Sequence, residues 1–154
     1  MPSSKLKNLE YLTGDLESPI ADMHFDLHKI PLEDDRFDVV FCNHVMEHVD
    51  DPLVCMKELH RVMKTGGWAI MQVPQDFNRD ETYEDASITS PEDREKHFWQ
   101  KDHVRLFGKN YPEYLRKAGF EVEEFLPKEK LGEELVKRYR LQLGEILYIA
   151  RKVN

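Results

Sequence analysis

The sequence predicts an α/β fold with a mostly parallel sheet, and three observations support this. Short apolar runs rich in β-branched residues alternate with longer runs whose apolar residues recur at helical spacing. Glycines and prolines stand at many of the junctions between these runs. The run at 37–42 is almost continuously apolar, which is typical of a strand buried on both faces. Strands that alternate with helices predict a sheet covered on both faces.

The apolar runs define six expected strands. They are Leu9–Leu16, Ala21–Leu27, Phe37–Cys42, Trp68–Val73, Phe120–Leu126 and Glu145–Lys152.

Helical spacing and capping signals define four expected helices. The first follows Asp51-Pro52, where Asp50 or Asp51 can cap it, and ends at Gly66-Gly67. The others are Pro91–Phe98, within a long polar excursion over Gln75–Lys101, then Lys109–Ala118 and Gly132–Tyr139.

Length and composition are those of one globular domain spanning residues 1–154. The chain is 40% hydrophobic and 34% charged, and its formal net charge is −8. This charge argues against a general nucleic-acid or membrane-surface binder, because such partners attract clustered Lys and Arg. The amino terminus has no signal-peptide core, and no run approaches the ~20 apolar residues of a membrane span, so we expect a cytoplasmic protein. Cys42 and Cys55 are expected to be buried thiols.

Two motifs and the order of the elements resemble those of class I S-adenosylmethionine (SAM)-dependent methyltransferases, in particular the type 11 group. The motifs are F-D-V-V-F-C-N-H-V-M-E-H-V at 37–49 and G-G-x-x-x-x-x-V-P at 66–74. The resemblance covers about Leu9 to Lys152. It implies a Rossmann-like sheet with one antiparallel strand from a carboxyl-terminal hairpin, and it implies SAM as the cofactor.

The sequence departs from this family at its amino end. Registered on the family, it starts just before the second strand, so we expect an amino-terminally truncated domain without the first strand–helix unit. The lost strand would lie at the centre of the sheet, between the second and fourth strands of the family. The glycine-rich turn that follows it is also absent, since the seven glycines are scattered.

Five residues are candidates for the cofactor site. Asp15 closes a strand, where a carboxylate can accept hydrogen bonds from ribose hydroxyls or simply form a turn. The resemblance places the SAM ribose at this position. It likewise gives Asp26 and Leu27 to the adenine, although a solvated loop aspartate is an equal alternative. Asn43 and His44 would line the methionine end.

The sharpest cluster comprises His44, Glu47 and His48, which share one face if the chain turns helically after Asn43. One imidazole could act as a general base for the methyl acceptor. Alternatively, the three groups could coordinate a divalent metal with a fourth ligand, or they could be structural. His103, in a segment that resembles one returning over the methyltransferase active site, is the natural fourth member. We favour for it a hydrogen bond to Glu47 or His48, and we assign no metal ligand from the sequence.

The resemblance implies transfer of a methyl group from SAM to a small-molecule acceptor, with His44, Glu47, His48 and His103 as catalytic candidates. We expect no nucleic-acid or membrane partner, and self-association into a homo-oligomer stays open. The principal alternative is a methyltransferase-like interaction or regulatory domain that does not bind SAM. A nucleotide-binding dehydrogenase is disfavoured because no G-x-G-x-x-G follows any expected strand.

Overall fold

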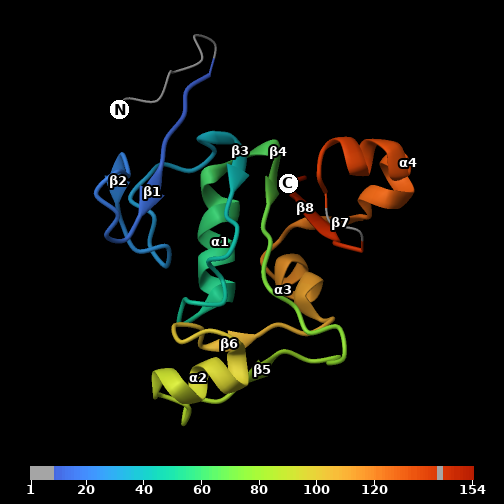
Figure 1. The fold of residues 1–154 in the computed structure, drawn as a ribbon. Helices are drawn as coiled ribbons and strands as arrows, with labels where there is room; N and C mark the ends of the chain where they lie inside the picture. The colour runs from blue at the N-terminus through green and yellow to red at the C-terminus, as the bar shows by residue number, and fades with distance from the viewer. Residues whose placement is uncertain (1–8, 142–143) are drawn as a thin grey trace.

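A four-stranded sheet organises the chain. In the computed structural model, which describes residues 9–141 and 144–154, the strand order is β3-β4-β8-β7 (Figure 1). These strands are β3 (Phe37–Phe41), β4 (Met63–Ile70), β8 (Leu147–Arg151) and β7 (Glu121–Phe125). β3 and β4 are parallel, whereas β8 is antiparallel to both β4 and β7. Three strands therefore run in one direction and the carboxyl-terminal strand opposes them, which confirms the predicted mostly parallel sheet.

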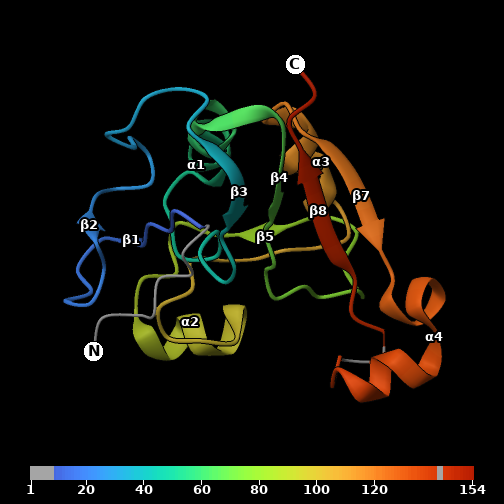
Figure 2. The ribbon, with the colours of Figure 1, turned by 90° about the horizontal axis from the view of Figure 1, so that it is seen from above.

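Two short strands form a separate parallel pair. β1 (Gly14–Asp15) pairs only with β2 (Met23–His24), and both lie to one side of the main sheet (Figure 2). The predicted strands at 9–16 and 21–27 were therefore too long. The reason is a lack of burial, since Leu9, Tyr11 and Leu16 are each more than half exposed. Among the described residues, no strand pairs with the outer edge of β3.

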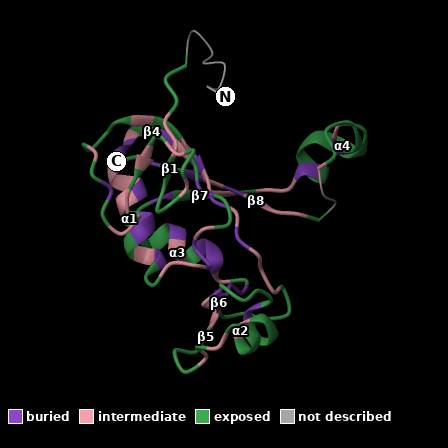
Figure 3. Cartoon of the chain, turned by 60° about the vertical axis from the view of Figure 1, so that its left-hand side comes forward, coloured by how far each residue is buried: buried purple, intermediate pink, exposed green. Residues whose placement is uncertain are grey.

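Two helices pack on one face of the sheet. α1 (Pro52–Val62) and α3 (Tyr111–Lys117) contact each other, and they also contact β4 and β7 respectively. Buried residues concentrate along them, whereas α4 (Pro127–Arg138) is mostly exposed and stands away from the sheet (Figure 3). The prediction of helices on both faces was therefore wrong. None of these helices, within the described part of the chain, is long and apolar enough to cross a membrane.

The other face of the sheet carries apolar side chains that lack a helical layer. Val39 pairs with Trp68 and Phe41 with Ile70 in the β3–β4 register, so all four point to this face. Phe41 is 65% exposed, and its ring meets that of Trp68 edge-on with centroids 5.8 Å apart. This half-covered sheet has one buried layer, made chiefly with α1 and α3.

The excursion after β4 forms a small lobe below the sheet. The predicted helix occurs there as α2 (Pro91–Phe98), capped by Ser90, whose Oγ accepts a hydrogen bond from the Asp93 N–H. The antiparallel pair of β5 (Tyr83–Glu84) and β6 (Arg105–Leu106) was not predicted, because neither strand is longer than two residues. This pair returns the chain beneath the end of β3 and α1 (Figure 1).

Two predicted helix boundaries were wrong. α1 ends at Val62, and Gly66-Gly67 lies within β4 rather than at a helix end. A Cβ at Gly67 would stand 2.9 Å from the carbonyl oxygens of Asp38 and Lys64, so glycine permits the close approach of β3 and β4. α4 begins at Pro127 instead of Gly132, where the structure has a kink with a left-handed φ of 77°.

The structure selects Asp51 as the cap of α1, and this can be tested. Asp51 Oδ1 accepts a hydrogen bond from the Val54 N–H at 3.0 Å. Replacing Asp51 with Ala is expected to lower the free energy of unfolding by about 1 kcal/mol in urea titrations, because one helix-end N–H loses its partner. Asp50→Ala, the neighbouring control, should leave it nearly unchanged. Equal losses in both variants would contradict this assignment.

Candidate functional site

The loop after β3 is anchored to the continuation of β4. The His44 N–H donates to the Gln72 carbonyl at 2.7 Å, and Asn43 Oδ1 accepts from the Gln72 N–H at 3.0 Å. Parallel pairing thus continues past Phe41 and presents this loop at the carboxyl edge of the sheet. His44 has a left-handed φ of 57°, so the chain turns sharply at this residue. Its side chain is 66% exposed.

The structure brings the four predicted catalytic residues together. His44 Nδ1 lies 3.5 Å and His48 Nε2 lies 4.0 Å from the same oxygen of Glu47, Oε1. The rings of His48 and His103 meet edge-on with centroids 4.7 Å apart. Glu47 and His103 are buried, whereas His48 is partly exposed. The cluster therefore has a buried floor and an exposed rim.

His103 is oriented differently from the prediction. Its Nδ1 donates to the Phe98 carbonyl at the end of α2 at 2.8 Å, so the favoured hydrogen bond to Glu47 or His48 was wrong. The carbonyl can only accept, which places the proton on Nδ1 and leaves the Nε2 lone pair free. The sequence gave no sign of this partner because an irregular turn, residues 99–102, brings His103 back to the helix end.

Arg105 is the residue that the sequence analysis did not single out. Its buried guanidinium donates to the carbonyls of Met46, Val49 and Asp50 and also to the carboxylate of Glu84. The Val104 N–H adds a bond to the Glu47 carbonyl at 2.9 Å. These contacts join the lobe to the loop that carries Glu47 and His48. They add to the contacts of His48 with Asp102 and His103, which also join the two segments.

The cofactor candidates Asp15 and Asp26 each hold a local turn. Asp15 Oδ1 accepts from the N–H groups of Glu17 and Ser18, which lowers the pKa of its carboxyl. Asp26 Oδ1 accepts from the His28 N–H and lies 2.6 Å from its Nδ1, and these contacts lower the Asp26 pKa.

Of the segments that carry Asp15 and Asp26, the one with Asp26 has a described hydrogen bond to the start of α1. His28 Nε2 accepts from the Asp51 N–H at 3.1 Å, close in sequence to the His44–His48 loop. Leu27 packs against the core beside it. The described contacts link neither Asp15 nor Asp26 directly to His44, His48 or His103, so their convergence on one pocket stays a prediction.

The two cysteines are free and buried, as predicted. Burial raises the pKa of both the Cys42 and the Cys55 thiol to about 12. Neither is therefore available as a thiolate nucleophile near neutral pH.

A family comparison covers the amino-terminal part of the chain. Residues 2–71 match the family model described as a methyltransferase domain. This match contains the loop after β3, α1 and all of β4.

Solved methyltransferases share the fold over nearly the whole chain. A SAM-dependent methyltransferase from Mesorhizobium loti aligns with a TM-score of 0.50 at 18% identity, covering 90% of this chain and 78% of that one. A second is the 1,6-didemethyltoxoflavin-N1-methyltransferase of Burkholderia thailandensis, solved with S-adenosylhomocysteine; the TM-score is 0.54 at 17% identity, with coverages of 92% and 60%. The chain therefore has the class I methyltransferase fold.

Curated relatives of this methyltransferase domain match over shorter stretches. An uncharacterised 37.1 kDa protein of transposon TN4556 from Streptomyces fradiae is 31% identical over 104 residues, which are 66% of this chain and 29% of that protein. Demethylmenaquinone methyltransferase of Staphylococcus aureus (strain JH9) is 40% identical over 48 residues, or 31% of this chain and 20% of the enzyme. The matched part of the chain thus spans less than a third of each of these curated relatives.

Removing the Arg105 contacts is expected to lower the stability of the chain substantially. Arg105→Met leaves three loop carbonyls without their donor, so we expect the free energy of unfolding to fall by about 3 kcal/mol or more. Arg94→Met is the control, because Arg94 makes one longer bond, at 3.4 Å, to the Ile88 carbonyl. Chemical denaturation measures both, and a loss below ~1 kcal/mol for Arg105→Met would contradict the role given to it.

Proposed function

We propose that the chain is the cofactor- and acceptor-binding part of a SAM-dependent methyltransferase that acts on a small molecule. The observation that carries this proposal is the polar loop at Asn43–His48, held at the carboxyl edge of the sheet, where open α/β folds bind ligands. The family match over residues 2–71 supports the assignment, as do the neighbouring structures solved with S-adenosylhomocysteine.

The residues present fit the nucleoside part of SAM better than its methionine part. Asp15 and Asp26 are exposed carboxylates just after or near strand ends, and each still has a second oxygen, Oδ2, that can accept from a ribose hydroxyl or an adenine amine. No described glycine forms a phosphate-type or methionine cradle: Gly14 packs against Phe25, and Gly108 against the Glu81 backbone. Asn43 and His44, at the carboxyl edge of the sheet, are the candidates for that end.

In this proposal the residues of the chain orient SAM and the methyl acceptor, and one of them removes a proton from the acceptor. When bound, SAM supplies a methyl group made electrophilic by its positively charged sulfur. In this proposal Asp15 and Asp26 hold the nucleoside, while the histidine rim receives the acceptor. His48 Nδ1 lies 3.3 Å from the Asp102 carbonyl, so the proton is on Nδ1 and the Nε2 lone pair can take a proton from an acceptor hydroxyl or amine. Glu47 stands beside the imidazolium formed and stabilises its charge.

A small, uncharged or cationic acceptor fits the surroundings. The lobe carries many carboxylates, and a hollow of about 350 Å³ beside Arg105 is lined by Asp50, Glu84, Asp85, Ala86, Ile88, Arg94, Val104 and Arg105. Carboxylates outnumber free cations there, because the Arg105 donors are occupied. An anionic polymer such as RNA would be repelled.

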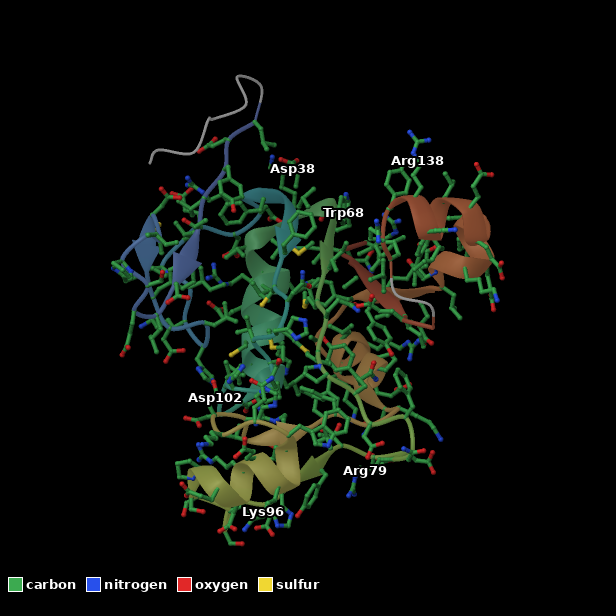
Figure 4. The ribbon with its side chains drawn as sticks, in the orientation of Figure 1. Asp38, Trp68, Arg79, Lys96, Asp102 and Arg138 are labelled. Atoms are coloured by element: carbon green, nitrogen blue, oxygen red, sulfur yellow. The ribbon has the colours of Figure 1, made fainter. Side chains whose placement is uncertain are left out.

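Calorimetric titration of the chain with SAM tests cofactor binding. We expect saturable heat, and Asp15→Asn should weaken binding about tenfold because it removes a charged acceptor from the ribose. Asp38→Asn is the matched control. Asp38, on β3, forms an ion pair with Lys64 of β4 and lies at the opposite end of the molecule from Asp102 (Figure 4). Equal affinities in the two variants would remove Asp15 from the site.

Release of S-adenosylhomocysteine in the presence of small phenols, quinols and amines tests the transfer step. His48→Ala is expected to slow turnover by about 10²–10⁴-fold with an acceptor that must lose a proton, whereas SAM affinity stays unchanged. His24→Ala, outside the cluster, is the control. Turnover of His48→Ala at the wild-type rate would remove this imidazole from the mechanism.

The alternative to this proposal is a domain that keeps the methyltransferase fold but does not bind SAM. The lack of a glycine cradle among the described residues favours it. The same titration decides, because a folded chain that gives no heat at millimolar SAM would be an interaction or regulatory module.

A further inference from the structure

One side-chain cluster has the composition of a metal site. Glu47, His48 and His103 each offer a ligand atom, and these atoms all lie within 4.8 Å of one another. They come from two segments that the Val104 and Arg105 contacts hold together. Asp102, labelled in Figure 4, marks this junction between the lower end of α1 and α2.

The Glu47 carboxylate is the strongest sign of a missing partner. Its side chain is 2% exposed, and neither Oε1 nor Oε2 has a hydrogen-bond partner in the described structure. A buried carboxylate is costly unless it is paired, hydrogen-bonded or bound to a metal. The nearest buried cation, Arg105, cannot serve, since its donors go to the carbonyls of Met46, Val49 and Asp50 and to Glu84.

Both imidazoles are oriented as metal ligands are. His103 Nδ1 donates to the Phe98 carbonyl at 2.8 Å, and His48 Nδ1 lies 3.3 Å from the Asp102 carbonyl and 3.4 Å from its Oδ2. Each ring therefore carries its proton on the outer nitrogen and leaves the Nε2 lone pair for coordination. A carbonyl or carboxylate behind the other ring nitrogen is what fixes histidines in metal centres.

We propose that Glu47, His48 and His103 bind one divalent transition-metal ion, with Zn²⁺ as the best-suited ion. Two imidazoles and one carboxylate make a donor set that Zn²⁺ accepts, leaving a fourth position for water or another ligand. The 33% exposed ring of His48 and the 66% exposed ring of His44 give the ion a route from solvent. His44 Nδ1, 3.5 Å from Glu47 Oε1, stands at the open side.

Ligand atoms around a tetrahedral Zn²⁺ lie about 3.4 Å apart, given bonds of about 2.1 Å. The 4.0 Å between His48 Nε2 and Glu47 Oε1 requires only a small rotation of the partly exposed His48 ring to reach this value. The metal-binding proposal does not rest on SAM binding, because Glu47, His48 and His103 are not among the SAM-binding candidates. With the ion bound, His48 Nε2 is a ligand, and it accepts a proton from a methyl acceptor only in the metal-free chain.

The test is titration of the chelator-treated full chain with Zn²⁺ by calorimetry, and with Co²⁺ by visible absorption. We expect one ion per chain. Glu47→Gln and His103→Asn should each weaken Zn²⁺ binding at least a hundredfold, while His44→Ala weakens it less than tenfold. His97→Asn is the matched control, because His97 bonds Tyr83 on the same lobe and lies outside the cluster.

Thermal unfolding keeps the test decisive if a variant folds poorly. Zn²⁺ should raise the Tm of the wild-type chain and leave that of Glu47→Gln unchanged. In the metal-free state, Glu47→Gln should be at least as stable as wild type, because it removes an unpartnered buried charge. A wild-type chain that binds neither ion, unchanged Zn²⁺ affinity in Glu47→Gln and His103→Asn, or a metal-free Glu47→Gln that is much less stable would each overturn the proposal.

The two proposals fail separately. A chain that binds Zn²⁺ without SAM would sink the methyltransferase proposal alone, and one that binds SAM without metal would sink the metal site alone.

Discussion

The structure around the candidate site depends on one buried guanidinium. Arg105 extends from β6 into the loop after β3. Its guanidinium donates hydrogen bonds to the main-chain carbonyls of Met46, Val49 and Asp50. A planar group with five donors can satisfy several acceptors at once, which a lysine could not do. Because β5 and β6 are only two residues long, main-chain pairing alone would hold the lobe weakly. Arg105, together with the Val104 N–H, therefore helps to set the position of His103 relative to Glu47.

In this arrangement the main-chain contacts that hold the loop are separate from the side chains that could bind a ligand. The main-chain carbonyls of Met46, Glu47, Val49 and Asp50 accept hydrogen bonds from Arg105 and Val104, while the Glu47 carboxylate has no hydrogen-bond partner in the described structure. A loop that is held by its backbone can keep reactive side chains in place at little cost to their freedom to bind. The same residues are therefore suited to receive a ligand, whether an ion or an acceptor.

Local signals predicted the elements that depend on local sequence. α2 was predicted with its observed bounds because Ser90 and Pro91 form a complete helix start. β3 followed from its apolar run, and the proximity of His44, Glu47 and His48 from their spacing. Gly67 was misread because glycine serves equally at a helix end and where two strands approach closely. The role of Arg105 and the isolation of the Glu47 carboxylate depend on partners more than twenty residues away, so no local pattern could reveal them.

Within residues 9–141 and 144–154, the outer edge of β3 is unpaired, and it adjoins a sheet face where Phe41 stands open to solvent. Free main-chain donors and acceptors beside an apolar surface are what two copies of a chain need to join strand to strand. Asp38 and Lys64 neutralise each other at one end of this edge, so they add little repulsion. The net charge of −8 opposes such pairing, and the reach of this repulsion shrinks as ions are added. Concentrated salt therefore favours aggregation of this chain rather than protecting it.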